Sequence, residues 1–234
     1  MKPYVISISG GSGSGKSLIA QVLAKRFKKH IVFLEADQYY KNAKHIPRIS
    51  GKYLNFDNPK AFDHALLAKH ILQLKKNKIV QSPIYNFLIH KRLKKTITKE
   101  PKPIILVEGI LLLADPSLRK LIDLKTYIHA FSDRRVAYRL YRDLTERKFT
   151  IRQAVYHYLH TASPMHYKYV KPTKKYANLI LDSNVDIHIP IEQLAKIIHK
   201  ILIKQKTHNE KYKSVDKKHY PKRFLKDIAK YTGG

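Results

Sequence analysis

Short hydrophobic runs alternate along this chain with longer stretches in which hydrophobic residues recur at helical spacing. Four runs have the length and composition of buried strands: 4–9, 31–34, 104–107 and 126–129. Between the first two we predict a helix from Ser17, with one face made of Ile19, Val22, Leu23 and Phe27. This alternation predicts βαβ units, and therefore an α/β fold around a mostly parallel sheet.

The middle of the chain adds a helix and a hairpin to this pattern. Asn58 followed by Pro59 is typical of a helix start. The hydrophobic stripe of that helix would be Phe62, Leu66, Leu67, Ile71 and Leu74. Residues 79–98 contain two β-rich stretches around a basic turn, which predicts a β-hairpin inserted into the sheet domain.

The pattern of the last third of the chain predicts mainly helices. Ser132 is a good N-cap residue type, and we predict a long charged helix from there to about Arg147. The further elements are expected in this order: helices at 151–160 and 165–176, a strand at 179–181, and a helix opened by Pro190.

These elements predict one main domain over residues 1–204. The inserted hairpin would occupy 78–99, and a helical lid region would occupy 132–160. Residues 205–234 are polar and basic, and we expect a tail that is either loose or a small docked appendage.

Composition narrows the class of protein. Hydrophobic residues make up 44% of the chain, which is typical of globular proteins. The absence of cysteine excludes disulfides and thiolate metal sites and fits a reducing cytoplasm. The longest hydrophobic stretch, 104–114, is interrupted by Glu108 and Gly109, and the run at 4–9 is too short for a signal peptide. We therefore expect a cytoplasmic protein with no membrane partner.

A net charge of +30 needs an explanation. One explanation is nucleic-acid binding through phosphate neutralisation. The other is a lysine-rich surface on an enzyme that handles anionic substrates. Of the 47 basic residues 36 are lysine, and they are spread along the whole chain. Specific readers of nucleic acid use arginine forks and clustered patches, so we favour the second explanation.

The strongest motif lies directly after the first predicted strand. It fits G-x-x-x-x-G-K-[ST] and consists of Gly10, Gly11, Ser12, Gly13, Ser14, Gly15, Lys16 and Ser17. In such a P-loop, backbone N–H groups wrap phosphates at a helix N-terminus. Lys16 would reach the β- and γ-phosphates, and Ser17 would hold Mg²⁺. The alternative, a merely flexible Gly/Ser loop, fits poorly between a strand and a helix.

Two carboxylates follow other predicted strands. Asp37 comes after the second strand, where a carboxylate can accept the proton of an acceptor hydroxyl and help to order Mg²⁺. Glu108 follows the strand at 104–107 and is placed for contact with the metal, either direct or through another of the metal's ligands. Taken alone, Asp37 would more often be a loop or helix-capping residue, whereas for Glu108 function and capping are about equally frequent. The P-loop favours the functional interpretation of both.

The predicted charged helix carries several arginines on one face. At about 100° per residue, Arg135, Arg139, Arg142 and Arg147 project to the same side. Such a face could close over a triphosphate as a lid and neutralise charge during transfer. The alternative is an ordinary solvated face on which Asp143 and Glu146 pair with the arginines.

In order and spacing, the motifs of this chain resemble the uridine/cytidine kinase family, within the group that also contains phosphoribulokinase. The resemblance spans about residues 4 to 203. Besides the P-loop, the segments that carry it are 37–40 (DQYY), 55–63 (NFDNPKAFD), 83–87 (PIYNF) with His90 and Arg92, 107–110 (VEGI), 139–147, and 171–177 (KPTKKYA). It implies a P-loop NTPase fold of three α/β/α layers with a helical lid, and ATP or GTP with Mg²⁺ as cofactors.

The resemblance also implies roles for the donor side of the site. Asp37 would be the base that activates the nucleoside 5′-hydroxyl, and Ser17 and Glu108 would surround Mg²⁺ together with it. Lys16, Arg139 and Arg142 would assist transfer, and Arg147 would bind the nucleotide.

On the acceptor side, Asp57 would accept hydrogen bonds from the ribose hydroxyls, with Phe56 beside it. The pyrimidine would be enclosed by Tyr85, Phe87 and His90 of the hairpin. Tyr40, Arg139 and His157 complete the expected acceptor contacts. Without the resemblance, Tyr85 and Phe87 would be read as hairpin core and His90 as a surface residue.

Several positions depart from the family pattern. The family usually has Glu-Arg-Gly-Arg at the end of the lid helix, but residues 146–149 are ERKF, so that the last arginine is replaced by Phe149. His157 stands where a glutamine is expected, Asn86 replaces an aspartate, and Ser163 replaces a basic residue. These changes leave the transfer machinery intact and alter contacts with the acceptor.

We therefore expect a kinase that phosphorylates uridine or cytidine on the 5′-hydroxyl, and the family suggests a homotetramer. Two alternatives stay open. One is a P-loop kinase of another small alcohol, such as a sugar phosphate or a pantothenate-like compound, which would suit the +30 charge and Phe149. The other is a non-catalytic P-loop protein that holds RNA, against which the intact Lys16, Ser17, Asp37 and Glu108 argue.

Overall fold

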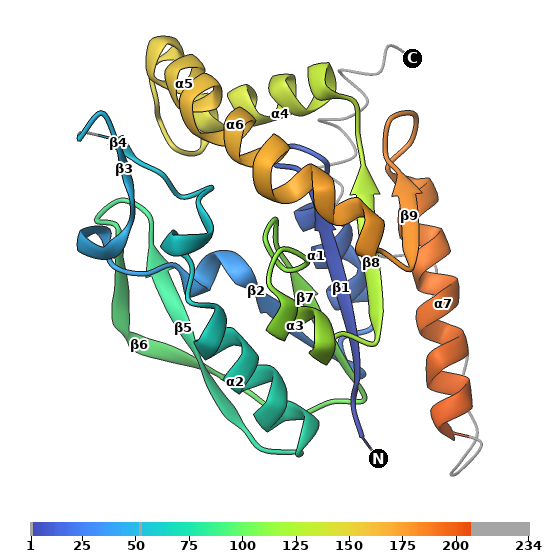
Figure 1. Cartoon of the computed structure of the whole chain (residues 1–234). Coiled ribbons are helices and arrows are strands. Elements are labelled where there is room, and N and C mark those ends of the chain that lie inside the picture. Colours follow the sequence, from blue (N-terminus) through green and yellow to red (C-terminus); the bar gives the residue numbers. More distant parts are fainter. Residues whose placement is uncertain (1, 52, 207–234) are drawn as a thin grey trace.

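A computed structural model describes residues 2–51 and 53–206 of the chain (Figure 1). Its centre is a sheet of five parallel strands in the order β2-β7-β1-β8-β9. The strands are β1 Tyr4–Gly10, β2 Ile31–Glu35, β7 Ile104–Glu108, β8 Leu124–His129 and β9 Leu179–Asp182. The predicted parallel α/β sheet is thereby confirmed, and each predicted strand lies within an observed one.

Helices cover both faces of the sheet because alternate residues of its strands point to opposite sides. On one face, Ile6 and Ile8 of β1 pack with α1 (Lys16–Arg26) and α7 (His188–Lys206). On the other face, Val5 of β1 and Val107 of β7 pack with α2 (His64–Lys75) and α3 (Pro116–Leu121). The result is the expected three-layer α/β/α arrangement with two hydrophobic cores.

The inserted hairpin lies beside the sheet domain and pairs only with itself among the described residues (Figure 1). Its strands are β5 Val80–Asn86 and β6 Lys91–Lys99. β5 buries Val80 and Tyr85 in the core, whereas β6 is mostly exposed and rich in lysine. A short pair of strands, β3 Arg48–Ile49 and β4 Tyr53–Leu54, lies nearby.

A run of helical segments, which begins with the predicted lid region 132–160, lies across the carboxyl ends of the strands, at the top of Figure 1. It begins with α4 (Ser132–Thr145) and α5 (Ile151–His157). It then continues without a break as π-helix Tyr158–Ala162, α6 Ser163–Met165, π-helix His166–Val170 and a 3₁₀ segment Lys171–Tyr176. The two separate helices predicted at 151–160 and 165–176 are therefore one continuous, irregular helical path.

One predicted helix start and one predicted capping residue are wrong. Asn58 caps only a 3₁₀ turn, Pro59–Ala61, and α2 begins later, where the Asp63 side chain accepts from Leu66 N. Ser132 is the first residue of α4 and makes no capping bond, since the cap position is Phe131. The helix α3, capped by Asp115, was not predicted because it is only 6 residues long.

The helices of the described part of the chain include none long and hydrophobic enough to cross a membrane. The prediction that 205–234 forms a tail falls almost wholly outside the described residues, which end at Lys206 within α7.

Candidate active site

The P-loop connects β1 to α1 at the carboxyl end of the central strand. Its backbone needs glycine where φ is positive, at Gly13 (φ 78°) and Gly15 (φ 80°), a region that side chains disfavour. Ser14 N donates to Gly11 O at 3.1 Å, which curls the loop over the first turn of α1. The loop therefore presents backbone N–H groups and a helix N-terminus to a phosphate chain.

Lys16, Ser17 and Glu108 meet directly beneath this loop. Lys16 Nζ lies 3.4 Å from Glu108 Oε1, and Ser17 Oγ donates to the same oxygen at 3.1 Å. Glu108 is buried, and burial raises the pKa of its carboxyl although Lys16 lowers it. A buried carboxylate with one cation beside it is a site that a second cation would stabilise.

Asp37 reaches the same edge of the sheet from the neighbouring strand. It lies in the 3₁₀ turn Ala36–Tyr39 directly after β2, whose last residue, Glu35, is the register partner of Glu108. The charge of Asp37 contributes to the raised pKa of Glu108, so the two carboxyl groups influence each other electrostatically. The three predicted metal ligands, Ser17, Asp37 and Glu108, thus come from three adjacent segments.

These three residues suit Mg²⁺ better than a metal held by protein ligands alone. Within residues 2–51 and 53–206, no cluster of three or more histidine, cysteine or acidic residues with metal-binding geometry is present. Mg²⁺ is usually held by one or two carboxylates together with substrate phosphates and water. Two carboxylates and a hydroxyl beside a phosphate loop match that need.

Arg139 of the helix α4 connects the P-loop to Asp57, the carboxylate predicted to bind the acceptor. Its Nη1 donates to Ser12 Oγ at 3.0 Å and lies 3.6 Å from Asp57 Oδ1. Its Nε donates to Asp143 Oδ2 at 2.7 Å. Burial by itself would lower the pKa of this guanidinium, but Asp57 and Asp143 together raise it. Arg139 is thus a fixed positive charge between the two halves of the site.

Arg142 and Arg147 complete the basic underside of the lid. Arg142 Nη2 donates to Ser12 Oγ at 3.1 Å, and Arg147 Nη1 donates to Asp143 Oδ1 at 3.1 Å. Burial and the neighbouring arginines lower the pKa of Arg142. Asp143 does pair with arginines, but it is fully buried. The arginine face of α4 is therefore not an ordinary solvent-exposed helix face.

The residues predicted to enclose the acceptor form an aromatic cluster. Tyr40 packs edge-on against four rings, with centroid distances of 5.1 Å to Phe56, 5.7 Å to Tyr85 and 6.2 Å to both Phe87 and Phe62. Phe56 in turn contacts His90 at 5.3 Å. Burial raises the pKa of Tyr40 well above its usual value, and the carboxylates of Asp37 and Asp57 add to the effect. The fold thereby brings together predicted site residues from three segments that are far apart in the sequence.

His157 lies against Phe149 rather than among the hairpin residues. The two rings are 5.1 Å apart and inclined by 30°, and His157 also meets Tyr53 edge-on at 5.3 Å. Burial and Arg139 lower the pKa of His157, which favours its neutral form. Two of the four positions that depart from the family pattern, Phe149 and His157, therefore contact each other.

Some residues at the site were missed by sequence reasoning. Thr161 Oγ1 lies 3.3 Å from Asp57 Oδ2 and is held by His157 O at 2.6 Å. His166 is buried with its Nδ1 unpaired, and burial and Arg135 lower its pKa to about 4. A Cβ on Gly11 would lie 3.0 Å from both His166 Cε1 and Arg135 Cδ. No local signal marks these residues, because they belong to an irregular helix that only the fold places over the P-loop.

A parallel sheet of this strand order, with its phosphate loop after the central strand and arginines closing from a helical lid, defines the class of P-loop kinases. The sequence narrows the class to a family. Residues 5–190 match the Phosphoribulokinase / Uridine kinase family, and the chain belongs to that family. It is therefore an enzyme of the kinase type that uses a nucleoside triphosphate.

Named relatives and solved structures agree with this assignment. The chain is 41% identical over 202 residues to the uridine kinase of Oceanobacillus iheyensis, covering 86% of this chain and 96% of the relative. It is 39% identical over the same length to the uridine kinase of Bacillus anthracis, covering 86% and 95%.

Among solved structures, a possible uridine kinase from Bacillus stearothermophilus has a TM-score of 0.56 at 16% identity and covers 78% of this chain and 90% of its own. Phosphoribulokinase from Rhodobacter spheroides has a TM-score of 0.57 at 12% identity, covering 77% and 70%. At such low identities these two structures support the fold only.

Proposed function

We propose that this chain transfers the γ-phosphoryl group of ATP to the 5′-hydroxyl of uridine or cytidine, giving UMP or CMP and ADP. The observation that carries the proposal is the position of Arg139, which joins Ser12 of the P-loop to Asp57 beside the aromatic cluster. A hydroxyl acceptor with a flat ring would then lie next to the phosphate chain. The relatives named uridine kinase, similar over 86% of the chain, support the same acceptor.

On the donor side, the P-loop backbone would bind the β- and γ-phosphates, and Lys16 would turn from Glu108 toward them. Ser17, Asp37 and Glu108 would hold Mg²⁺, which when bound offsets the charge of the phosphate oxygens. Arg147 would add positive charge at the nucleotide from the end of the lid.

The chemical step needs a base and charge stabilisation. Asp37 would accept the proton of the 5′-hydroxyl while that oxygen attacks the γ-phosphorus, and the bond from phosphorus to the β–γ bridging oxygen would break to release ADP. Arg139 and Arg142, held at Ser12, would donate to the oxygens of the moving phosphoryl group.

The acceptor would be held by a carboxylate and by rings. Asp57 would leave its long contact with Arg139 to accept from the vicinal ribose hydroxyls. Tyr85, Phe87 and His90 of the hairpin would enclose the pyrimidine. Phe56 and Tyr40 would support that wall from behind, since Tyr40 packs against Phe56, Tyr85 and Phe87. His157, which is half-buried, would lie at the edge of the space that the acceptor occupies.

Further parts of the proposal concern the whole chain. The division into a kinase domain at 1–204, with hairpin 78–99 and lid 132–160, remains a prediction, as do the homotetramer, a cytoplasmic location and the choice of ATP over GTP. The absence of a nucleic-acid partner is likewise an expectation.

The test is ADP release coupled to a reporter reaction, with Mg²⁺ and ATP against a panel of acceptors. The panel contains uridine, cytidine, purine nucleosides, ribulose 5-phosphate and pantothenate. We expect turnover with uridine and cytidine alone. Turnover only with another alcohol would keep the kinase and overturn the acceptor. The absence of ADP release with every acceptor, together with salt-sensitive RNA binding, would overturn the proposal and support the RNA-binding alternative.

A further inference from the structure

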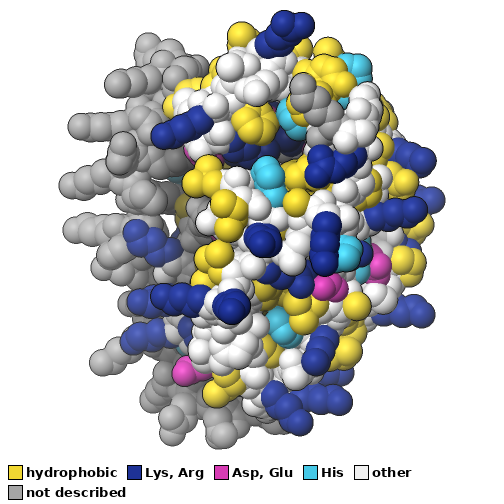
Figure 2. All heavy atoms as spheres, turned by 90° about the vertical axis from the view of Figure 1, so that its left-hand side faces the viewer, with side chains coloured by type: hydrophobic (Ala, Val, Ile, Leu, Met, Phe, Trp, Pro, Cys, Tyr) yellow, Lys and Arg dark blue, Asp and Glu magenta, His cyan; other side chains and the backbone are white. Residues whose placement is uncertain are grey.

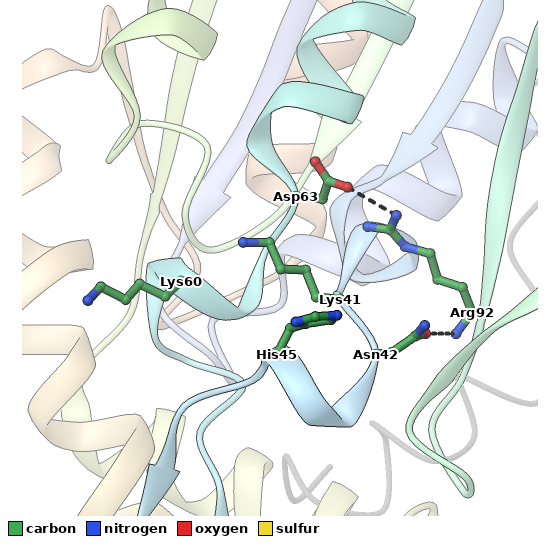
Figure 3. Close-up of a pocket in the computed structure, with 6 residues that line it drawn as sticks. All are labelled: Lys41, Asn42, His45, Lys60, Asp63 and Arg92. Carbon is green, nitrogen blue, oxygen red and sulfur yellow. Dashed lines mark hydrogen bonds and ion pairs between the residues drawn. The ribbon is translucent and has the colours of Figure 1, made fainter.

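A polar cavity lies on the hairpin side of the molecule, and its lining includes no residue of the P-loop, the predicted metal ligands or the lid. It has a volume of about 580 Å³, within the range of roughly 300–1,000 Å³ typical of small-molecule pockets. Its lining comes from the segment after Tyr40, the start of α2 and the hairpin: Lys41, Asn42, His45, Lys60, Asp63 and Arg92 (Figure 3). No residue of the proposed transfer machinery belongs to this lining.

The acceptor atoms of this cavity are already engaged. Asp63 uses Oδ1 to cap α2 through Leu66 N at 3.0 Å, and its Oδ2 accepts from Arg92 Nη1 at 3.0 Å. The side-chain oxygen of Asn42 accepts from Arg92 N at 2.9 Å. The two bonds to Arg92 are the dashed lines of Figure 3. The cavity therefore offers a ligand few hydrogen-bond acceptors.

The donors of the cavity remain available. Within the described part of the chain, neither Lys41 nor Lys60 takes part in an ion pair. Arg92 commits three of its five N–H groups, to Tyr39 O, Tyr40 O and Asp63, and the Asn42 amide keeps its N–H₂ free. The lining thus carries three positive charges, of which only that of Arg92 is paired with the single carboxylate, Asp63. Such a cavity favours a compact anion with many acceptor oxygens.

The surrounding surface supports an anionic ligand as well. The face of the molecule that Figure 2 shows is covered with lysine and arginine side chains, with few acidic ones between them. This field would concentrate anions near the cavity. A positive potential spread over a whole face cannot by itself favour one binding position. That preference has to come from the donors that line the cavity, which are Lys41, Arg92 and Asn42, with the exposed Lys60 at its edge.

From this donor-only lining we infer that the cavity at Lys41, Lys60 and Arg92 is a binding site for a phosphate group, separate from the P-loop. The ligand is free orthophosphate or the phosphate of a small monoester such as a nucleoside monophosphate. The site adjoins the aromatic cluster through the backbone, since Lys41 follows Tyr40 and Arg92 Nε holds Tyr40 O at 2.7 Å. Binding of a ligand in the cavity would therefore affect the position of Tyr40 and of the aromatic rings that pack against it.

The test measures phosphate binding while the P-loop is filled. Full-length protein is saturated with Mg²⁺ and a non-hydrolysable ATP analogue, and binding of radiolabelled orthophosphate or UMP is followed by equilibrium dialysis. We expect one bound anion per chain. In the double variant Lys41→Gln/Lys60→Gln the affinity should fall about tenfold or more, because two cationic donors are lost.

The matched control is Lys78→Gln/Lys94→Gln, which removes the same charge from exposed positions outside the cavity. It should keep the wild-type affinity, and both double variants should keep the wild-type melting temperature and analogue binding. Equal binding of orthophosphate and UMP would mean that the phosphate group alone is recognised. Tighter binding of UMP would identify the monoester where the excess is lost in Lys41→Gln/Lys60→Gln. UMP binding that this variant keeps belongs to the proposed acceptor site and, without orthophosphate binding, overturns the inference. No binding beyond the analogue, or an equal loss in both double variants, overturns it.

Discussion

Arg139 lies between Ser12 and Asp57, with its Nη1 3.0 Å from the serine hydroxyl and 3.6 Å from the carboxylate. One buried cation thus contacts the loop that binds the donor and the carboxylate proposed to bind the acceptor. Such a residue can stabilise the negative charge that develops during phosphoryl transfer. Its contacts can also depend on whether both substrates are bound.

Replacement of Arg139 tests this bridge. We expect Arg139→Lys to lower kcat by roughly 10²- to 10³-fold, because a lysine cannot reach Ser12, Asp57 and Asp143 together. Steady-state kinetics with saturating ATP would measure the loss. The exposed Arg152→Lys is the control and should behave as wild type. A wild-type kcat in Arg139→Lys would contradict the proposed role.

The proposed base gives a second prediction. Asp37→Asn keeps the size of the side chain but cannot accept the proton, so turnover should fall by about 10²- to 10⁴-fold. ATP affinity, measured by calorimetry, should stay within about twofold if Mg²⁺ coordination tolerates the amide. An unchanged rate would exclude Asp37 as the base.

The metal site gives a third prediction. Ser17→Ala removes the hydroxyl that now donates to Glu108, and one ligand of Mg²⁺ with it. We expect the Mg²⁺ concentration for half-maximal rate to rise by about tenfold or more. Titration of the rate with Mg²⁺ at fixed ATP measures it. The same Mg²⁺ requirement in wild type and variant would mean that Ser17 is not a ligand.

Gly11 tests the closeness of the lid to the P-loop. A Cβ at this position would lie 2.5 Å from Arg135 Nη1 and 3.0 Å from Arg135 Cδ and His166 Cε1, so that the side chains of the lid that cover the loop have to shift. We expect Gly11→Ala to lower kcat by about tenfold or more, with little change in melting temperature, because the lid is displaced and the core is untouched. A wild-type kcat would show that the lid adapts without cost.

His166 gives a prediction for acid stability. Its pKa is lowered to about 4 by burial and by Arg135, whereas an unfolded histidine titrates near 6.5. The unfolded chain therefore binds more protons between these values, and the stability that is complete above pH ~6.5 is lost as the pH falls toward ~4. Urea titrations at pH 7 and at pH 4.5 measure the free energy of unfolding. Between these two pH values it should decrease less in His166→Asn than in the wild type.

The exposed His160→Asn serves as the control for that experiment and should follow the wild-type pH dependence. Burial also lowers the pKa of His64, His70 and His157, so some acid sensitivity should persist in His166→Asn. Identical curves for His166→Asn and wild type would show that His166 is not a source of the effect.

Much of the donor side could be predicted from local sequence. The P-loop is continuous in the chain, and Asp37 and Glu108 follow hydrophobic strands at the point where parallel strands end together. The arginine face of α4 follows from helical periodicity alone. These features depend on short-range geometry, which residue type and spacing encode.

The tertiary structure decided what those residues contact. The sequence could not show that Arg139 reaches both Ser12 and Asp57, that Phe149 stacks on His157, or that His166 lies over Gly11. It also misplaced the start of α2, since the capping bond of Asp63, which also pairs with Arg92, outweighs the local signal of Asn58-Pro59. Contacts between distant segments depend on how layers pack and how an irregular helix bends, and no local pattern records them.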